Sequence, residues 1–93
     1  MKSTARRVVI SGHVQGVGYR VWMAAQAQVH GVSGWVRNRH DGTVEALVDG
    51  DPASVQELLR ACRRGPRGAR VDAIEETEAE PPAEPGFHKR PTA

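Results

Sequence analysis

The sequence predicts an α+β fold in which an antiparallel sheet carries two helices on one face. Two observations lead to this prediction. Strand-like and helix-like segments follow one another in the order strand, helix, strand, strand, helix, strand (βαββαβ), and the chain has 93 residues. This order is typical of the ferredoxin-like two-layer sandwich. Because a chain of this length suits one hydrophobic core, we expect a single domain over residues 1–93, with its core at about 5–77.

The first predicted strand, Arg7–Gly12, has apolar residues on both faces, since Val8 and Val9 point to opposite sides. We expect this strand to be central in the sheet. A helix is predicted over Val21–His30, where good helix formers are followed by Gly31 as a C-terminal stop. Apolar residues recur there at helical spacing and should face the sheet. They are Val21, Ala24, Ala25 and Val29.

Two further strands are predicted over Val32–Arg39 and Thr43–Asp49, on either side of His40-Asp41-Gly42. Asp-Gly between segments of period two is a strong hairpin signal, so these strands should pair antiparallel. A second helix begins at Asp51-Pro52, an N-cap followed by proline at the first helical position, and ends at Gly65-Pro66. Its apolar residues at helical spacing are Val55, Leu58, Leu59 and Cys62.

The last predicted strand of the core is Ala69–Thr77. Val71 and Ile74 are three residues apart in it, which indicates a bulge or an early end. Residues 78–86 contain three prolines and three glutamates and are predicted to form a polar loop. The tail, residues 87–93, is a candidate for a short edge strand.

A glycine-rich loop joins the first strand to the first helix and ends in a cation. Gly16 and Gly18 lack a Cβ, so their backbone can adopt positive φ and turn successive N–H groups inward, which forms a cradle for phosphate. Arg20 follows in the first helical turn, where the macrodipole disfavours a cation by about 0.3–1 kcal/mol. An anion between the guanidinium and the N–H groups would reverse that effect. The residues expected to bind it are Gln15, Gly16, Val17, Gly18, Tyr19 and Arg20.

A second polar residue, Asn38, is expected to lie near this loop. The helix runs roughly 15 Å away from the loop at ~1.5 Å per residue. The strand from Val32 returns roughly 20 Å at ~3.3 Å per residue. Asn38 should therefore come back close to Arg20. The alternative is that Asn38 only opens the hairpin turn, which asparagine does well.

Several kinds of site are not indicated by the sequence. The loop has no Gly-Lys-Ser/Thr ending, and Val21 stands where a dinucleotide-binding loop needs a third glycine. Cys62 is the only cysteine, and the four histidines lack ligand spacing, so neither a disulfide nor a metal site is expected. No apolar run approaches the ~20 residues of a membrane span. We therefore expect a cytoplasmic protein that does not bind membranes.

Five arginines lie between residues 60 and 70, in a window without acids. We interpret them as a solvated helix end, where cations are favourable, and the alternative is a nucleic-acid patch. The chain has one tyrosine and one phenylalanine, so it lacks the paired aromatics that stack bases, and no nucleic-acid partner is expected. These arginines are Arg60, Arg63, Arg64, Arg67 and Arg70.

Two stretches of the sequence resemble the signature sequences of the acylphosphatase family. The first is the Gly-x-Val-Gln-Gly-Val-x-aromatic-Arg loop of Gly12–Arg20. The second begins with Gly-aromatic-Val-Arg-Asn at Gly34–Asn38. With the matching order of elements, the resemblance covers about residues 5–77. The second stretch continues at the intervals of the family with Gly42, Val44 and Gly50.

The resemblance implies an enzyme that hydrolyses the carboxyl–phosphate bond of acyl phosphates. Arg20 would bind the phosphate, and Asn38 would orient the attacking water. The implied partners are a small-molecule acyl phosphate as substrate and inorganic phosphate as product and competitive inhibitor. We expect a monomer that needs no metal or organic cofactor.

Three positions depart from the family pattern, and one alternative function stays open. His30 stands where the family commonly has leucine, and Lys89 replaces an expected apolar residue in the tail. Tyr19 stands where the family usually has phenylalanine, so its hydroxyl must find a partner or reach solvent. The alternative function is a non-catalytic module that binds phosphate, or an acyl or carbamoyl phosphate, in the same cradle.

Overall fold

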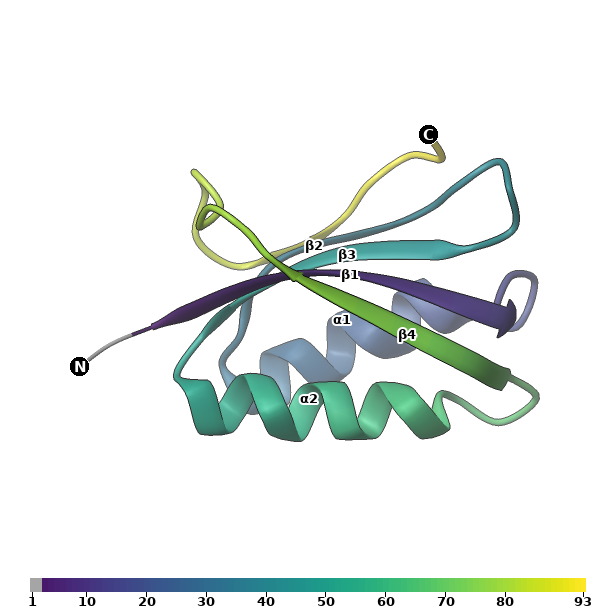
Figure 1. Cartoon of the computed structure of the whole chain (residues 1–93), viewed down its shortest axis with the longest axis horizontal. Coiled ribbons are helices and arrows are strands. Elements are labelled where there is room, and N and C mark those ends of the chain that lie inside the picture. The colour runs from purple at the N-terminus through teal and green to yellow at the C-terminus, as the bar shows by residue number, and fades with distance from the viewer. Residues whose placement is uncertain (1–2) are drawn as a thin grey trace.

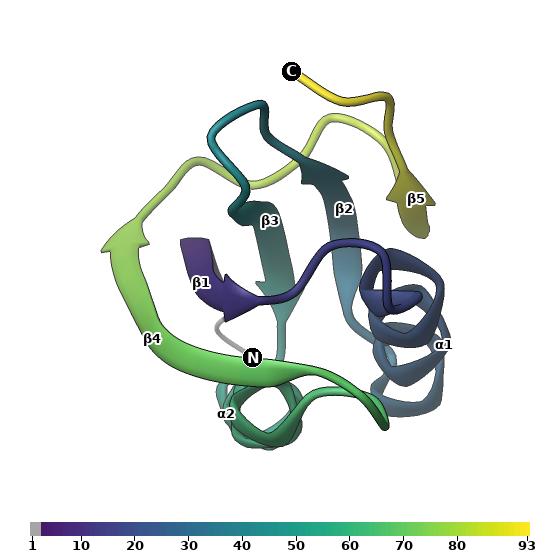
Figure 2. The ribbon, with the colours of Figure 1, turned by 90° about the vertical axis from the view of Figure 1, so that its right-hand side faces the viewer.

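The computed structural model describes residues 3–93 and follows the predicted order of elements (Figure 1), with the short edge strand expected in the tail present as a fifth strand (Figure 2). Within these residues, no helix is long and apolar enough to cross a membrane. The elements are β1 (Thr4–His13), α1 (Tyr19–His30), β2 (Ser33–Asn38), β3 (Val44–Gly50), α2 (Pro52–Arg64), β4 (Arg70–Glu78) and β5 (Phe87–Lys89).

The five strands form one sheet in the order β4-β1-β3-β2-β5. The pairs β1–β3, β1–β4 and β2–β3 are antiparallel, whereas β5 is parallel to β2. Both helices cover the same face of the sheet (Figure 2). The predicted ferredoxin-like α+β sandwich is therefore confirmed. The sheet is mixed rather than wholly antiparallel, because the segment after β4 carries the chain to the opposite edge before β5 begins.

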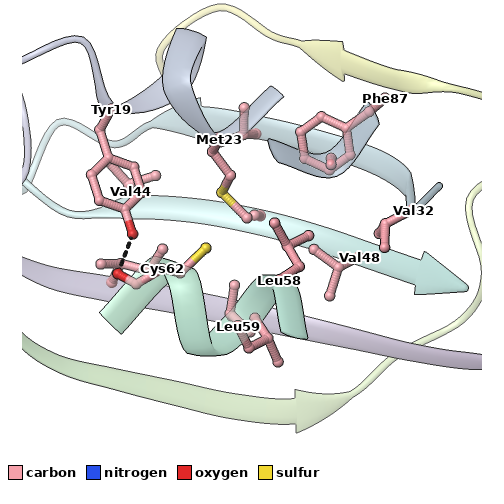
Figure 3. Close-up of a cluster of buried hydrophobic side chains, with 14 of the residues drawn as sticks. Tyr19, Met23, Val32, Val44, Val48, Leu58, Leu59, Cys62 and Phe87 are labelled. Atoms are coloured by element: carbon pink, nitrogen blue, oxygen red, sulfur yellow. Dashed lines mark hydrogen bonds between the residues drawn. The ribbon is translucent and has the colours of Figure 1, made fainter. Parts of the chain in front are cut away.

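The hydrophobic core lies between the sheet and the two helices (Figure 3). Phe87 of β5 is buried against this core as well. The apolar stripe predicted for α2 is confirmed, because spacing and burial agree along the whole helix. Complete burial of a Val or Leu side chain stabilises a fold by about 1.5–3 kcal/mol. The buried residues of α2 include all four predicted ones, Val55, Leu58, Leu59 and Cys62.

The stripe predicted for α1 is wrong at Val21, Ala25 and Val29, which are exposed, and right only at Ala24, which is partly buried and packs against the core. Val21 is 61% exposed and Val29 is 78% exposed. The buried residues are Tyr19, Met23 and Ala27, which are spaced four apart. The helix starts at Tyr19, two residues earlier than predicted, so the row that faces the core begins with an aromatic side chain. Tyr and Met bury more apolar area than the alanines of the predicted row, and the helix turns that face inward.

The bulge expected in the last core strand is present. Ser11 pairs with Ala73 and Gly12 pairs with Val71, so Asp72 has no partner across the β1–β4 ladder. A bulge bends its strand and increases the local twist. It lies just before the point where β1 gives way to the glycine-rich loop.

The tail continues along β2 beyond β5. The Arg90 N–H donates to the Val36 carbonyl at 2.8 Å, and the Ala93 N–H donates to the Asn38 carbonyl at 3.0 Å. The His40 N–H in turn donates to the Ala93 carbonyl at 2.9 Å. The tail is thus held beside β2 as far as the β2–β3 turn. That turn lies at the same end of the molecule as the glycine-rich loop (Figure 1).

Candidate active site

The glycine-rich loop has the backbone conformation expected of an anion cradle. Gly16 has φ 76° and Gly18 has φ 75°, both in the left-handed region. Gly18 is the N-cap of α1 and offers no side chain to the first N–H groups of the helix. The first helical hydrogen bond joins the Trp22 N–H to the Gly18 carbonyl at 3.0 Å. The N–H groups of the first turn lack intrahelical partners, so they can bind an anion.

A cavity of about 130 Å³ opens at this helix start. It contains Arg20 from the first turn of α1 and Asn38 from the end of β2. The structure therefore places Arg20 and Asn38 in one cavity, as the predicted path of the chain indicates. Val14 and Val21 also line the cavity, although sequence reasoning did not place them in the site. The lining residues are Val14, Gln15, Gly16, Gly18, Tyr19, Arg20, Val21 and Asn38.

Gln15 uses its side chain to hold the loop against the β2–β3 turn. Its Nε2 donates to the Arg39 carbonyl at 2.8 Å and to the Thr43 carbonyl at 2.9 Å. These carbonyls flank the turn that follows Asn38. The carboxamide of Gln15 thus fixes the distance between the loop and the strand that carries Asn38.

Tyr19 lies in the core with its side chain directed toward α2 (Figure 3). Its hydroxyl donates to the Cys62 carbonyl at 2.7 Å. That carbonyl belongs to the last turn of α2, which leaves its carbonyls without intrahelical partners. Burial raises the pKa of Tyr19 well above its usual value, and Cys62 raises it further. The hydroxyl therefore stays protonated and joins the two helices instead of contacting a ligand.

Val17 is not a lining residue of the cavity, although it belongs to the predicted set. Its side chain is partly buried and packs against the hydrophobic core. The side chains of Gln15, Val17 and Tyr19 therefore anchor the loop, and Gly16 and Gly18 between them line the cavity.

Arg20 brings a positive charge that no carboxylate of the structure neutralises. Among the ion pairs between residues 3 and 93, none includes Arg20. Its Nη1 donates only to the Arg90 carbonyl of the tail, at 3.4 Å. The guanidinium is thus oriented by a neutral acceptor, and no ion pair between residues 3 and 93 balances its charge.

Arg37, which precedes Asn38, is held by Glu45 on the other face of β2. Arg37 donates from Nε to Glu45 Oε1 at 2.8 Å, and Arg7 donates from Nε to Glu45 Oε2 at 2.6 Å. Burial alone would raise the pKa of Glu45, but the hydrogen bonds from these two arginines outweigh it and lower the pKa. This network holds β1, β2 and β3 together on the face of the sheet opposite the core.

Other parts of the described chain offer weaker sites. Within residues 3–93, no group of three or more His, Cys, Asp or Glu side chains could hold a metal ion. A hollow of about 280 Å³ lies beside α2 and β4, and it is lined by Arg60, Arg63 and Glu76 among others. Arg63 and Glu76 form an ion pair there at 3.5 Å. That hollow contains no part of the glycine-rich loop.

The comparisons with known proteins point to one family. The acylphosphatase family model matches residues 6–89. A relative named Acylphosphatase, from Acidiphilium cryptum strain JF-5, is 62% identical over 88 residues, covering 95% of this chain and 97% of the relative.

Solved structures also match this chain. The crystal structure of acylphosphatase from Bacillus subtilis matches with a TM-score of 0.87 at 32% identity, covering 92% of this chain and 97% of that chain. The crystal structure of full-length HypF in its phosphate- and nucleotide-bound form matches with a TM-score of 0.89 at 27% identity. This match covers 98% of this chain and 12% of HypF.

Proposed function

Because the chain belongs to the acylphosphatase family, we propose that Arg20 and Asn38 are the catalytic residues of its active site. The protein is an acylphosphatase, which hydrolyses the carboxyl–phosphate bond of an acyl phosphate to a carboxylate and phosphate. The observation that supports the assignment of residues is one cavity lined by a guanidinium from a helix start and a carboxamide from a strand end.

Arg20 and the backbone of the loop bind the phosphoryl group in this proposal. Phosphoryl transfer passes through a loose transition state with charge on the three equatorial oxygens, so positioning and electrostatic stabilisation do most of the work. The guanidinium donates to two of these oxygens in the fork geometry typical of arginine. The N–H groups from Gln15 to Arg20 donate to the rest, and the positive end of α1 adds to the attraction.

Asn38 positions the water that attacks phosphorus. Its carboxamide both donates and accepts hydrogen bonds, so it can hold a water in line with the bond that breaks. The leaving group is a carboxylate whose conjugate acid has a pKa near ~4, so it departs without a general acid. The proton of the attacking water passes to an oxygen of the phosphoryl group.

Replacing the carboxamide tests the role of Asn38. Asn38→Ala should lower kcat for benzoyl phosphate by about 100-fold or more, with a smaller change in KM, because it removes a contact made to the water and not to the bound substrate. Gln56→Ala is the matched control, because it removes an exposed carboxamide from α2. An Asn38→Ala variant with the kcat of the wild type would refute the assignment.

The reaction as proposed needs no metal ion or organic cofactor. The guanidinium and the N–H groups supply the positive charge that a metal ion would otherwise provide. Turnover of benzoyl phosphate should therefore be equal before and after treatment with excess chelator. Loss of activity that returns on addition of a divalent cation would contradict this proposal.

The remaining expectations about the protein are part of the same proposal. We propose a monomeric, single-domain enzyme over residues 1–93 that acts in the cytoplasm. Inorganic phosphate should compete with the substrate, because it is the product and fits the cradle. Sedimentation and inhibition kinetics test the monomer and the competition.

A binding module is the second candidate, and the match to a small part of HypF favours it. In that case the cradle would hold phosphate or an acyl or carbamoyl phosphate without turnover. The relative from Acidiphilium, which matches over nearly its whole length, favours the enzyme. Calorimetric phosphate binding without any hydrolysis of an acyl phosphate would decide for the module.

A further inference from the structure

Val21 is an apolar residue in an unusual position. It follows Arg20 directly, lines the cavity and is 61% exposed. The buried row of α1 runs through Tyr19, Met23 and Ala27, so Val21 contributes little to the core. A β-branched residue is also not favoured by a helix. Neither packing nor helix propensity explains a valine here.

The size of the cavity leaves the acyl group outside it. Ligand pockets that enclose a whole drug-sized molecule have roughly 300–1,000 Å³, whereas this cavity has about 130 Å³. The phosphoryl group occupies the cradle, and the leaving oxygen points away from the water that Asn38 holds. The acyl group therefore projects over the rim.

The rim offers this acyl group one apolar contact. Of the two valines that line the cavity, Val14 is 1% exposed and its side chain belongs to the core. Val21 is the lining valine with a surface still open to solvent. An apolar acyl group lying over Val21 would remove apolar area of both partners from water, which favours binding.

We infer that Val21 determines specificity for the acyl group and favours aromatic or alkyl acyl phosphates over those with a small or polar acyl group. This inference rests on the proposed function, since it takes the phosphoryl group to bind at Arg20. The contact is made by the part of the substrate that does not react. It therefore acts mainly on KM.

The helix supplies a matched control for this inference. Val29 lies on the same exposed side of α1 and is 78% exposed. It is eight residues from Val21, or about 12 Å at ~1.5 Å per residue. Val→Thr at either position keeps the shape and the β-branch and replaces one methyl group by a hydroxyl. The two variants differ in distance from the cavity.

The experiment compares benzoyl phosphate with acetyl phosphate. Val21→Thr should lower the ratio of kcat/KM for benzoyl phosphate to kcat/KM for acetyl phosphate by about 3- to 10-fold, chiefly through KM for benzoyl phosphate. Val29→Thr should leave this ratio unchanged. A Val21→Thr ratio equal to that of the wild type would overturn the inference, and so would an equal change in both variants. Thermal unfolding of both variants checks that each is folded.

The failure of this inference is distinguishable from the failure of the proposed function. If Arg20→Gln abolishes turnover of both substrates while Val21→Thr leaves the ratio intact, only the inference about Val21 is wrong. If Arg20→Gln hydrolyses both substrates at the wild-type rate, the proposed site is wrong as well.

Discussion

The two helices differ in how their N-termini are completed. α2 has the N-cap Asp51, whose carboxylate accepts from the Ala53 N–H at 3.1 Å, followed by Pro52 at the first helical position. Arg63 and Arg64 lie in its last turn, where the macrodipole favours cations. Every one of these features stabilises the helix in the absence of a ligand.

α1 departs from these rules at its N-terminus alone. Its N-cap is Gly18, which has no side chain to accept a hydrogen bond, and its first turn carries Arg20 and no acid. Its C-terminus is ordinary, since the N–H of Gly31 donates to the Ala27 and Gln28 carbonyls. The N-terminus of α2 thus has the cap residues that stabilise a helix, whereas the N-terminus of α1, which lines the cavity, lacks them.

The largest expected effect comes from comparing Arg20 in the first turn of α1 with Arg64 in the last turn of α2. Arg20→Gln should lower kcat/KM for benzoyl phosphate by about 100- to 1,000-fold or more, because it removes the charge that stabilises the transition state. The free energy of unfolding should rise or stay within ~0.5 kcal/mol, since a cation is unfavourable at a helix N-terminus. Steady-state kinetics and urea unfolding measure the two quantities.

Arg64→Gln is the control for this prediction. Arg64 is exposed in the last turn of α2, where it stabilises the helix. Its replacement should lower the free energy of unfolding by about 0.3–1 kcal/mol and leave kcat/KM unchanged. If Arg20→Gln destabilised the protein while keeping its activity, Arg20 would have a structural role and no catalytic one.

The two glycines at the ends of α1 give the next largest effect. Gly18 and Gly31 both have left-handed backbones, with φ 75° and 68°, and neither has an atom within 4 Å of an added Cβ. Each Gly→Ala variant should therefore lose about 1–2 kcal/mol of stability through backbone strain alone.

Activity should separate these two variants. Gly18→Ala should also lower kcat by about 10-fold or more, because a shift of the backbone misplaces the N–H groups of the cradle. Gly31→Ala should keep the wild-type kcat at 25 °C. Equal kcat values in the two variants would mean that the backbone of the loop does not bind the phosphoryl group.

The contrast between the helices also explains which parts of the fold the sequence predicts correctly. In α2 the cap, the proline and the apolar spacing agree, and the predicted buried face is right. In α1 the alanines fit several faces, and the choice depends on Tyr19 and Met23. The predicted helix begins at Val21 and leaves Tyr19 in the loop, so the sequence pattern does not include the residue that selects the buried face. The parallel pairing of β5 depends on a polar loop with no pattern of its own.

The sequence predicts the part of the site that depends on residue spacing along single elements. Residue spacing along one helix and one strand suffices to bring Arg20 and Asn38 to one cavity. The bridge from Gln15 to the Arg39 and Thr43 carbonyls depends on the tertiary position of a turn. The exposed position of Val21 depends on which face of α1 is buried. Neither feature is encoded in a local pattern.

The contact between the two helices gives a prediction for alkaline pH. Burial raises the pKa of Cys62 to about 12, and the pKa of Tyr19 is raised as well. In the unfolded chain the thiol loses its proton near pH ~8.5 and the phenol near pH ~10. The unfolded state then binds fewer protons than the folded state. Stability should thus fall above about pH 9, by up to ~1.4 kcal/mol per pH unit for each group.

Cys62→Ala tests the thiol's share of this loss. The chain has one cysteine, so the variant should be less stable at pH 7 but lose less stability than the wild type between pH 9 and pH 10. Urea unfolding at intervals of half a pH unit measures both slopes. Identical slopes would show that the buried thiol does not contribute.

The smallest effect is expected at the N-cap of α2. Asp51→Ala removes the carboxylate that accepts from the Ala53 N–H and should lower the free energy of unfolding by about 1 kcal/mol. For a domain of this size, that corresponds to a fall of roughly 4–8 °C in Tm. The kcat for benzoyl phosphate at 25 °C should not change, because α2 begins at the end of the molecule opposite the glycine-rich loop (Figure 1). A lower kcat without a lower Tm would mean that this helix start also serves the reaction, and the two N-termini would then not be specialised as their caps indicate.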